Sequence, residues 1–322
     1  MSGAFSAYGR KLSSELIKSI KKRAAIPQAQ KTYQDEDILR FANEEMDHVL
    51  LPLIIRVKEE FYVKTDTITL ATGQTRVKIP YRAIGSKIRN LWIESASGGT
   101  RRAMTRIQPE DLTEFDMGVS NGSKAVFYLE GDNIVLISAT GISTGDSLKV
   151  SYYLRPNDIV VENRVPQITR IVQNISTADI YLTSLPTHFE IGMEIDFIEN
   201  VGNCQTIAYD IPVLDVNDNV SGEVRLTINL SDLPSGLIAN DHVALSGETK
   251  VPQIPSDLHA VLAQAVACRI LEAQSDPNLD RAEKTLAKMM DAANALVDTR
   301  TEGTPQKILQ SGGFLKRKRY IG

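Results

Sequence analysis

The chain has 322 residues and a mass of 35.5 kDa. Its content of 42% hydrophobic and 24% charged residues is typical of folded proteins with a large core and argues against disorder. The formal net charge of −4 argues against general attraction to nucleic acids. With two cysteines, Cys204 and Cys268, and no apolar run near the about 20 residues that cross a bilayer, we expect neither a disulfide framework nor a membrane protein.

The N-terminal part of the chain has the hydrophobic period of helices. Apolar residues recur every three or four positions over residues 16–24, and Pro27 ends this first predicted helix. A second predicted helix begins near residue 32, with acidic residues 35–37 in its first turn. At Pro52 we expect a kink, or a new helix with the proline in its first turn.

From residue 61 onward the hydrophobic period becomes two, which indicates strands with one buried face. The clearest signal is a hairpin formed by residues 125–130 and 133–137 around Gly131 and Asp132. Turn residues separate the later strands at the spacing of a small sandwich or barrel. These later strands are predicted at residues 168–175, 180–185, 193–198, 206–216, 224–230 and 242–245.

The helical period returns near the C-terminus, where residues 258–271 form one apolar face and residues 279–299 form a second predicted helix. Each helical pair has an apolar face that needs a partner, so the two ends of the chain should pack into one helical bundle. The fold class expected is therefore α+β, with a large, mainly antiparallel β insertion and an extended C-terminal tail. The expected parts are N-terminal helices at 1–60, β insertion at 61–157 and 158–250, C-terminal helices at 251–300 and a basic tail at 301–322.

Motifs of catalytic chemistry are weak. Residues 141–145 match the Gly-x-Ser-x-Gly pattern around Ser143, but strands flank them instead of the strand-to-helix turn that a hydrolase needs. Residues 215–219 resemble the start of a calcium loop, yet Val220 and Leu226 stand where glycine and glutamate are required, so we expect a plain turn. The four histidines show no ligand spacing. We expect no catalytic, metal-binding or cofactor-binding residues.

The C-terminal tail differs from the rest of the chain in charge. Residues 303–322 carry a charge of +5 and no acid, which leaves −9 for the remainder. One interpretation is a solvated terminus; the other is a docking arm whose apolar residues fill pockets on an acidic partner while its cations pair with acids. The candidate docking residues are Ile308, Leu309, Phe314, Leu315, Lys316, Arg317, Lys318, Arg319 and Tyr320.

Short phrases spread over most of the chain resemble one known family. They lie at residues 16–24, 37–45, 51–62, 79–85, 151–156 and 251–255, and the closing helix pair and basic tail add to the likeness. Together they resemble the head-to-tail adaptor proteins of tailed bacteriophages, also called connector or head-completion proteins. Residues 158–250 contribute least to the resemblance.

The resemblance implies a structural, non-enzymatic protein of the virion neck. Such adaptors bind beneath the portal protein, commonly as a ring of twelve copies, by means of helices and a C-terminal arm. They extend the channel through which genomic DNA passes without sequence-specific binding, and they offer a surface to the tail or nozzle protein. We therefore expect the protein in the virion neck, and in the host cytoplasm during assembly, without a membrane partner.

Other functions stay open at this point. A tail-terminator or tail-tube protein is the nearest alternative, although those proteins are usually β-dominated and lack a bracketing helical bundle. A nucleic-acid-binding protein would bind DNA in a salt-dependent way. A hydrolase would react with a serine-directed probe at Ser143.

Overall fold

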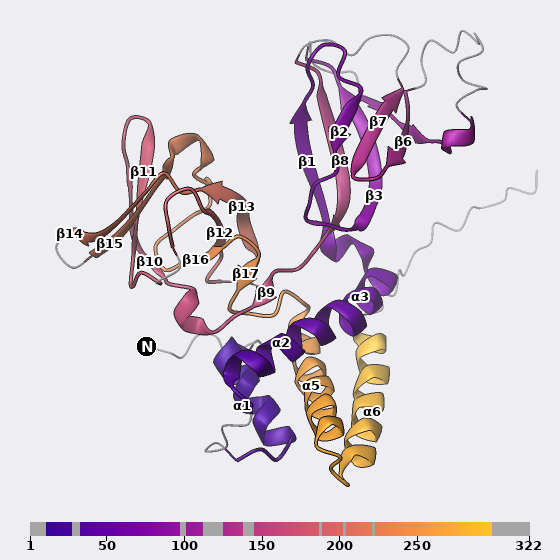
Figure 1. Ribbon diagram of the computed structural model, residues 1–322, viewed down its shortest axis with the longest axis vertical. Coiled ribbons are helices and arrows are strands. Elements are labelled where there is room, and N and C mark those ends of the chain that lie inside the picture. The colour runs from indigo at the N-terminus through magenta and orange to yellow at the C-terminus, as the bar shows by residue number, and fades with distance from the viewer. Residues whose placement is uncertain are drawn as a thin grey trace, which may run out of the picture.

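The computed structural model describes residues 11–27, 33–96, 101–111, 125–137, 145–186, 189–201, 204–220 and 223–297. Helices from both ends of the chain lie together, and two β regions extend from them in different directions (Figure 1). Almost all strand pairs are antiparallel, which confirms the mixed α+β class.

The N-terminal helices form as predicted from their apolar period. Pro52 lies in the first turn of a new helix, and a π-helical turn precedes it. Because proline has no N–H, the regular hydrogen-bond ladder cannot pass through this position. The elements are α1 (Ser13–Arg23), α2 (Asp35–Glu45), the π turn (Met46–Leu50), α3 (Leu51–Val57) and a 3-10 turn (Glu59–Tyr62).

The C-terminal helices are α5 (His259–Ala273) and α6 (Leu279–Val297), which follow a 3-10 turn at Ser256–Leu258. Helix α5 is buried on nearly every side, as expected for a helix that is apolar all round. Its side chains share one apolar core with α1, α2 and α3. The core residues with no exposed surface include Leu16, Ile20, Ile38, Met46, Ile54, Leu262, Val266 and Ile270.

The first β region contains two four-stranded sheets around one core, with strand orders β1-β8-β3-β4 and β2-β7-β6-β5. The predicted hairpin is confirmed as β6 and β7, and Gly131 takes the positive φ of 55° that its turn requires. The strands are β1 (Val63–Thr69), β2 (Arg76–Lys78), β3 (Ala83–Glu94), β4 (Arg101–Ala103), β5 (Thr105–Arg106), β6 (Val126–Glu130), β7 (Asn133–Ile137) and β8 (Ser147–Leu154).

The second β region has sheets of order β10-β11-β15-β14 and β13-β12-β16 around a separate core. Its strands are β10 (Ile168–Gln173), β11 (Thr177–Leu182), β12 (Glu194–Ile198), β13 (Thr206–Pro212), β14 (Asp215–Val220), β15 (Glu223–Asn229) and β16 (His242–Leu245). The short strands β9 (Asp158–Ile159) and β17 (Glu248–Thr249) pair in parallel where the chain enters and leaves this region. Short 3-10 turns lie at Pro109–Asp111, Glu162–Arg164 and Leu230–Asp232.

Two predictions in the second β region are wrong. The single strand expected at residues 206–216 is two strands in different sheets, because Pro212 cannot donate a hydrogen bond and ends β13. The turn expected at residues 215–219 is β14, which lies at the edge of its sheet. An edge strand has only one neighbour and tolerates polar side chains, so its composition resembles that of a turn.

Candidate assembly surfaces

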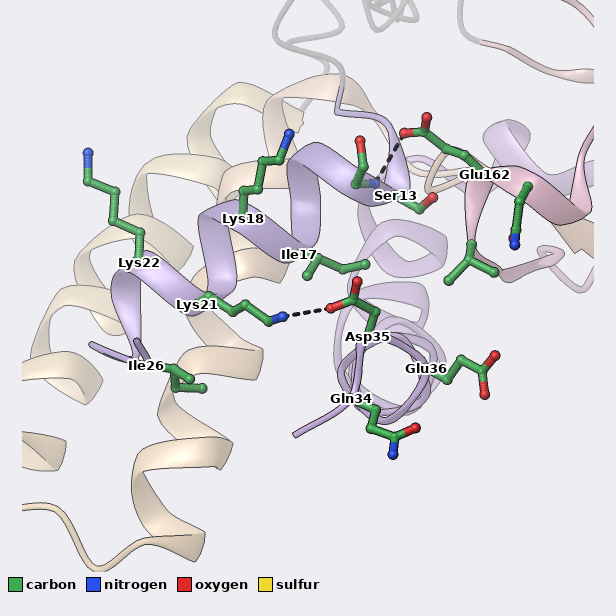
Figure 2. A pocket seen from close by; sticks show the side chains of 13 residues that line it. Ser13, Ile17, Lys18, Lys21, Lys22, Ile26, Gln34, Asp35, Glu36 and Glu162 are labelled. Atoms are coloured by element: carbon green, nitrogen blue, oxygen red, sulfur yellow. Dashed lines mark hydrogen bonds and ion pairs between the residues drawn. The ribbon is translucent and has the colours of Figure 1, made fainter. Parts of the chain in front are cut away.

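A groove of about 960 Å³ lies between α1, the start of α2 and residues 161–163 (Figure 2). Helix α1 lines it with lysines and α2 with acids, so its two walls have opposite charge. Apolar side chains complete the lining. The principal lining residues are Ile17, Lys18, Lys21, Lys22, Ile26, Asp35, Glu36, Val161 and Glu162.

Two polar contacts cross this groove. The Lys21 ammonium lies 2.6 Å from the Asp35 carboxylate, and the backbone N–H of Ser14 donates to Glu162 at 3.3 Å (Figure 2). The Asp35 side chain is 55% exposed, so the ion pair contributes only about 0–1 kcal/mol to stability. The groove therefore combines an apolar lining with walls of opposite charge, and the ion pair across it is weak.

A buried arginine joins the two β regions. Arg82 follows β2 in the first region, and its side chain is only 7% exposed. Its guanidinium donates to both carboxylate oxygens of Asp196 at 2.9 and 3.0 Å, and its Nε donates to Asp210 at 3.0 Å. These aspartates lie on β12 and β13 of the second region, so one side chain links two separate cores.

Further groups complete the Arg82 junction. Asn157 accepts from Arg82 at 2.9 Å and donates to Asp196 at 2.7 Å, while the Ser246 hydroxyl accepts from Arg82 at 2.8 Å. The ring of Tyr209 lies 4.9 Å from the guanidinium, a cation–π distance. All three guanidinium nitrogens of Arg82 therefore donate hydrogen bonds, and the planar group fixes the orientation of its partners as well as pairing with their charge.

The pKa values of the two aspartates of the junction shift in opposite directions. Burial raises the pKa of Asp196 above its ordinary value, although Arg82 opposes this effect. Burial also acts on Asp210, but hydrogen bonds from Arg82, Ser246 and Tyr81 outweigh it and lower the pKa of that carboxyl. Asp210 also has a positive φ of 60°, which is strained for a residue with a side chain. A strained backbone and a buried charge are both costly, so their presence at the junction indicates a contact that the surrounding structure holds in place.

The connection between the helices and the second β region is also polar. The Asn43 side chain donates to the Ile159 carbonyl at 3.2 Å and accepts from the Ile159 N–H at 2.8 Å. The Tyr62 hydroxyl donates to the Gln253 carbonyl at 3.0 Å. Helix α2 thereby holds β9, and the end of the N-terminal helices holds the chain that leads back into α5.

The sequence-predicted docking residues, from Ile308 to Tyr320, lie outside the described residues, as does Ser143. Arg23, in the last turn of α1, donates to Gln264 on α5 at 2.6 Å. Within the described ranges, no cluster of three or more metal-ligating side chains occurs. No helix in the described part is long and apolar enough to cross a membrane.

The Arg82 junction escaped sequence analysis, although signals for it were present. Asp196 lies between the apolar residues Ile195 and Phe197 of β12, and a fully buried acid requires a partner. Arg82 itself lies in the phrase at residues 79–85 that carried part of the family resemblance. The partner could not be identified from sequence, because 114 positions separate the two residues.

In the described chain, helices from both ends share one core, and a polar junction joins the two β regions. The model of the SU10 adaptor protein family matches residues 13–185, more than half of the chain. The protein therefore belongs to this family of bacteriophage structural adaptors, which implies interaction with other phage structural proteins and fits a place in the virion. No curated protein sequence matches the chain significantly.

Proposed function

We propose that the protein is a head-to-tail adaptor of the virion neck. In this role copies of the chain, most simply twelve, form a ring beneath the portal protein, extend the DNA channel and offer the tail or nozzle protein an attachment surface. The family match over residues 13–185 carries the proposal, since an adaptor joins two larger assemblies. A tail-terminator or tail-tube protein, which is usually β-dominated, is less consistent with a core that the described helices α1, α2, α3, α5 and α6 share.

The arrangement of the helices supports this proposal. Helices from both ends share one apolar core, and we propose that they act as a single bundle that seats against the portal. The first and second β regions, residues 61–157 and 158–250, have their own cores and act as separate parts. Helix α6 ends at Val297 beside α3, so the basic tail starts from the helical part of the molecule.

We propose that this tail is the docking arm. Its apolar residues would fill portal pockets, where a desolvated aromatic anchor commonly contributes ~2 kcal/mol or more, while its cations would pair with acids at the rim. The test is complementation of a gene-deleted phage with a chain that lacks residues 312–322. We expect DNA-filled heads without tails, and a folded chain, because the truncation keeps every described residue of the helical core.

Two point variants provide the matched comparison. Phe314→Ala should reduce tailed particles more than Lys316→Ala, since a buried aromatic contributes more to affinity than a rim charge. Imaging of the necks then counts the copies in the ring. Normal plaque numbers with the truncated chain would overturn the docking-arm role, and a neck without this protein would overturn the adaptor function itself.

A further inference from the structure

The two β regions carry opposite net charges. Residues 61–157 contain twelve Lys and Arg against nine Asp and Glu, a net charge of +3. Residues 158–250 contain four Lys and Arg against fourteen Asp and Glu, a net charge of −10. The Arg82 junction pairs only one of these cations with two of these acids. Most of the opposite charge therefore stays on the surfaces of the two regions.

The first β region concentrates arginines along one edge. Strands β4 and β5 are the last strands of their respective sheets, and they follow each other directly along the chain. Arg101, Arg102 and Arg106 are exposed on them. Arg101 pairs with Glu94 at 3.2 Å, while Arg102 and Arg106 form no ion pair within the described residues. We call these three residues the arginine edge.

The second β region has an apolar patch with acids beside it. Ile191 and Leu214 are 64% and 42% exposed. Backbone hydrogen bonds of 2.9 Å from Gly192 to Val213, and of 2.8 Å from Val213 to Met193, hold the two segments together. Glu190 and Glu194 are exposed next to Ile191. An apolar centre with a charged rim is the usual anatomy of a protein contact. We call Glu190, Ile191, Glu194 and Leu214 the acidic patch.

We propose that the arginine edge of one copy docks on the acidic patch of the next copy in the ring, an inference that rests on the proposed function. Strand β6, beside β5, lies on the side of the first region away from the second (Figure 1), and the acidic patch lies at the start of β12 and in the segment between β13 and β14. The arginine edge and the acidic patch are different surfaces, so their contact between copies is heterologous, and such a contact forms a ring when the rotation between copies closes.

Charge decides between possible occupants of the acidic patch. Genomic DNA is repelled by its glutamates. Among the described residues, no hydrogen bond or ion pair joins the arginine edge of one copy to its own acidic patch. A second copy supplies exposed arginines on two edge strands, and guanidinium groups can pair with carboxylates through two hydrogen bonds while their stems cover aliphatic side chains.

Cross-linking in assembled particles tests this contact. The double variant Arg102→Cys with Glu194→Cys is incorporated into phage, and the necks are treated with a short bis-maleimide. The native thiols of Cys204 and Cys268 are buried, which keeps their background low. We expect dimers and higher multiples of the chain from the double variant and monomers from each single variant. Cross-links from Arg102→Cys alone would indicate a symmetric contact and overturn the proposal.

A charge exchange provides the second readout. Arg102→Glu should lower the yield of tailed particles about tenfold or more, and Arg102→Glu with Glu194→Arg should restore it. Lys87→Glu, at an exposed lysine on β3 of the same region, is the matched control and should leave the yield unchanged. Neck rings that are visible by imaging but give neither cross-links nor rescue would overturn the contact alone. Necks without any ring of this protein would instead overturn the proposed function.

Discussion

The first β region, residues 61–157, and the second, residues 158–250, are both built from antiparallel strands around an apolar core, yet their net charges are +3 and −10. Their buried polar groups differ as well. The second region buries Asp196, Asp241 and His242 almost completely, whereas the first buries mainly Arg82 and Asp146. Similar cores therefore carry different chemistry, because the apolar period decides the fold and the remaining positions are free to build contacts.

Exposed apolar side chains sharpen this difference. In the described part of the chain, six of the eight large hydrophobic residues that are most exposed lie in the second region, and only Tyr81 lies in the first. Acidic charge alone would serve solubility, whereas acidic charge around exposed aliphatic groups is typical of a protein contact. The six are Val172, Ile175, Ile191, Val201, Leu214 and Ile238. We infer that the second region supplies most of the contact surface and the first supplies the complementary cations.

The largest effect is expected where the two regions meet. Arg82→Met removes the cation that faces Asp196, a residue with no exposed surface, and leaves a buried carboxylate without its charge partner. Breaking such a pair typically costs about 3–5 kcal/mol. Urea unfolding of the purified chain should therefore show a loss of this size.

Arg76→Met is the matched control for that substitution. Arg76 pairs with Glu130 at 2.8 Å, but both side chains are more than half exposed, so the expected loss is only about 0–1 kcal/mol. Equal small losses for the two variants would contradict a structural role of the Arg82 junction and would leave the two β regions independent of each other.

The next largest effect is a loss of stability in acid, which we expect in the second β region because it contains His242. Burial and the neighbouring Lys250 lower the pKa of His242 to about 3 in the folded chain, against an ordinary value of 6.5. The unfolded chain thus binds the proton first, so the stability that neutral His242 provides is complete above pH 6.5 and is lost as the pH falls toward 3. At pH 5 the loss is about 2 kcal/mol.

Two local probes can follow this difference. Trp92, the single tryptophan, reports on the first region by fluorescence, and amide exchange in β12 and β16 reports on the second. His242→Gln cannot titrate, and its amide can still reach the side chain of Asn200, which lies 3.2 Å from His242. We expect acid to loosen β16 in the parent chain and not in this variant. Equal acid sensitivity in both would show that another group controls the pH dependence.

Local elements were predictable from the sequence because periodicity is a local property. The helices around Leu16 and Leu262, and the hairpin at Gly131, follow directly from apolar spacing and turn residues. Pro212 and the polar strand β14 show where this reasoning stops, since strand pairing and edge position depend on distant partners.

The candidate surfaces were less predictable than the fold. A buried charge such as Asp196 signals that a partner exists, but only the folded chain identifies that partner as Arg82. The acidic patch likewise joins Ile191 and Leu214 through backbone contacts between two strands and their turns. Neither surface has a local motif. The docking tail, by contrast, was proposed from composition alone, and it stays a prediction.

The smallest effect on stability is expected at the tip of the β10–β11 hairpin. Ile175 is fully exposed there, so Ile175→Ser should change the free energy of unfolding by less than about 0.5 kcal/mol. Single exposed aliphatic residues are ordinary on protein surfaces, which means that only a functional readout can distinguish a contact residue from a neutral one. If the second region binds the tail protein through this hairpin, the variant forms stable chains but fewer tailed particles. Ile175→Val, which keeps an aliphatic side chain at the same position, is the matched control and should give a normal yield. An unchanged yield of tailed particles for both variants would remove the hairpin tip from the contact surface.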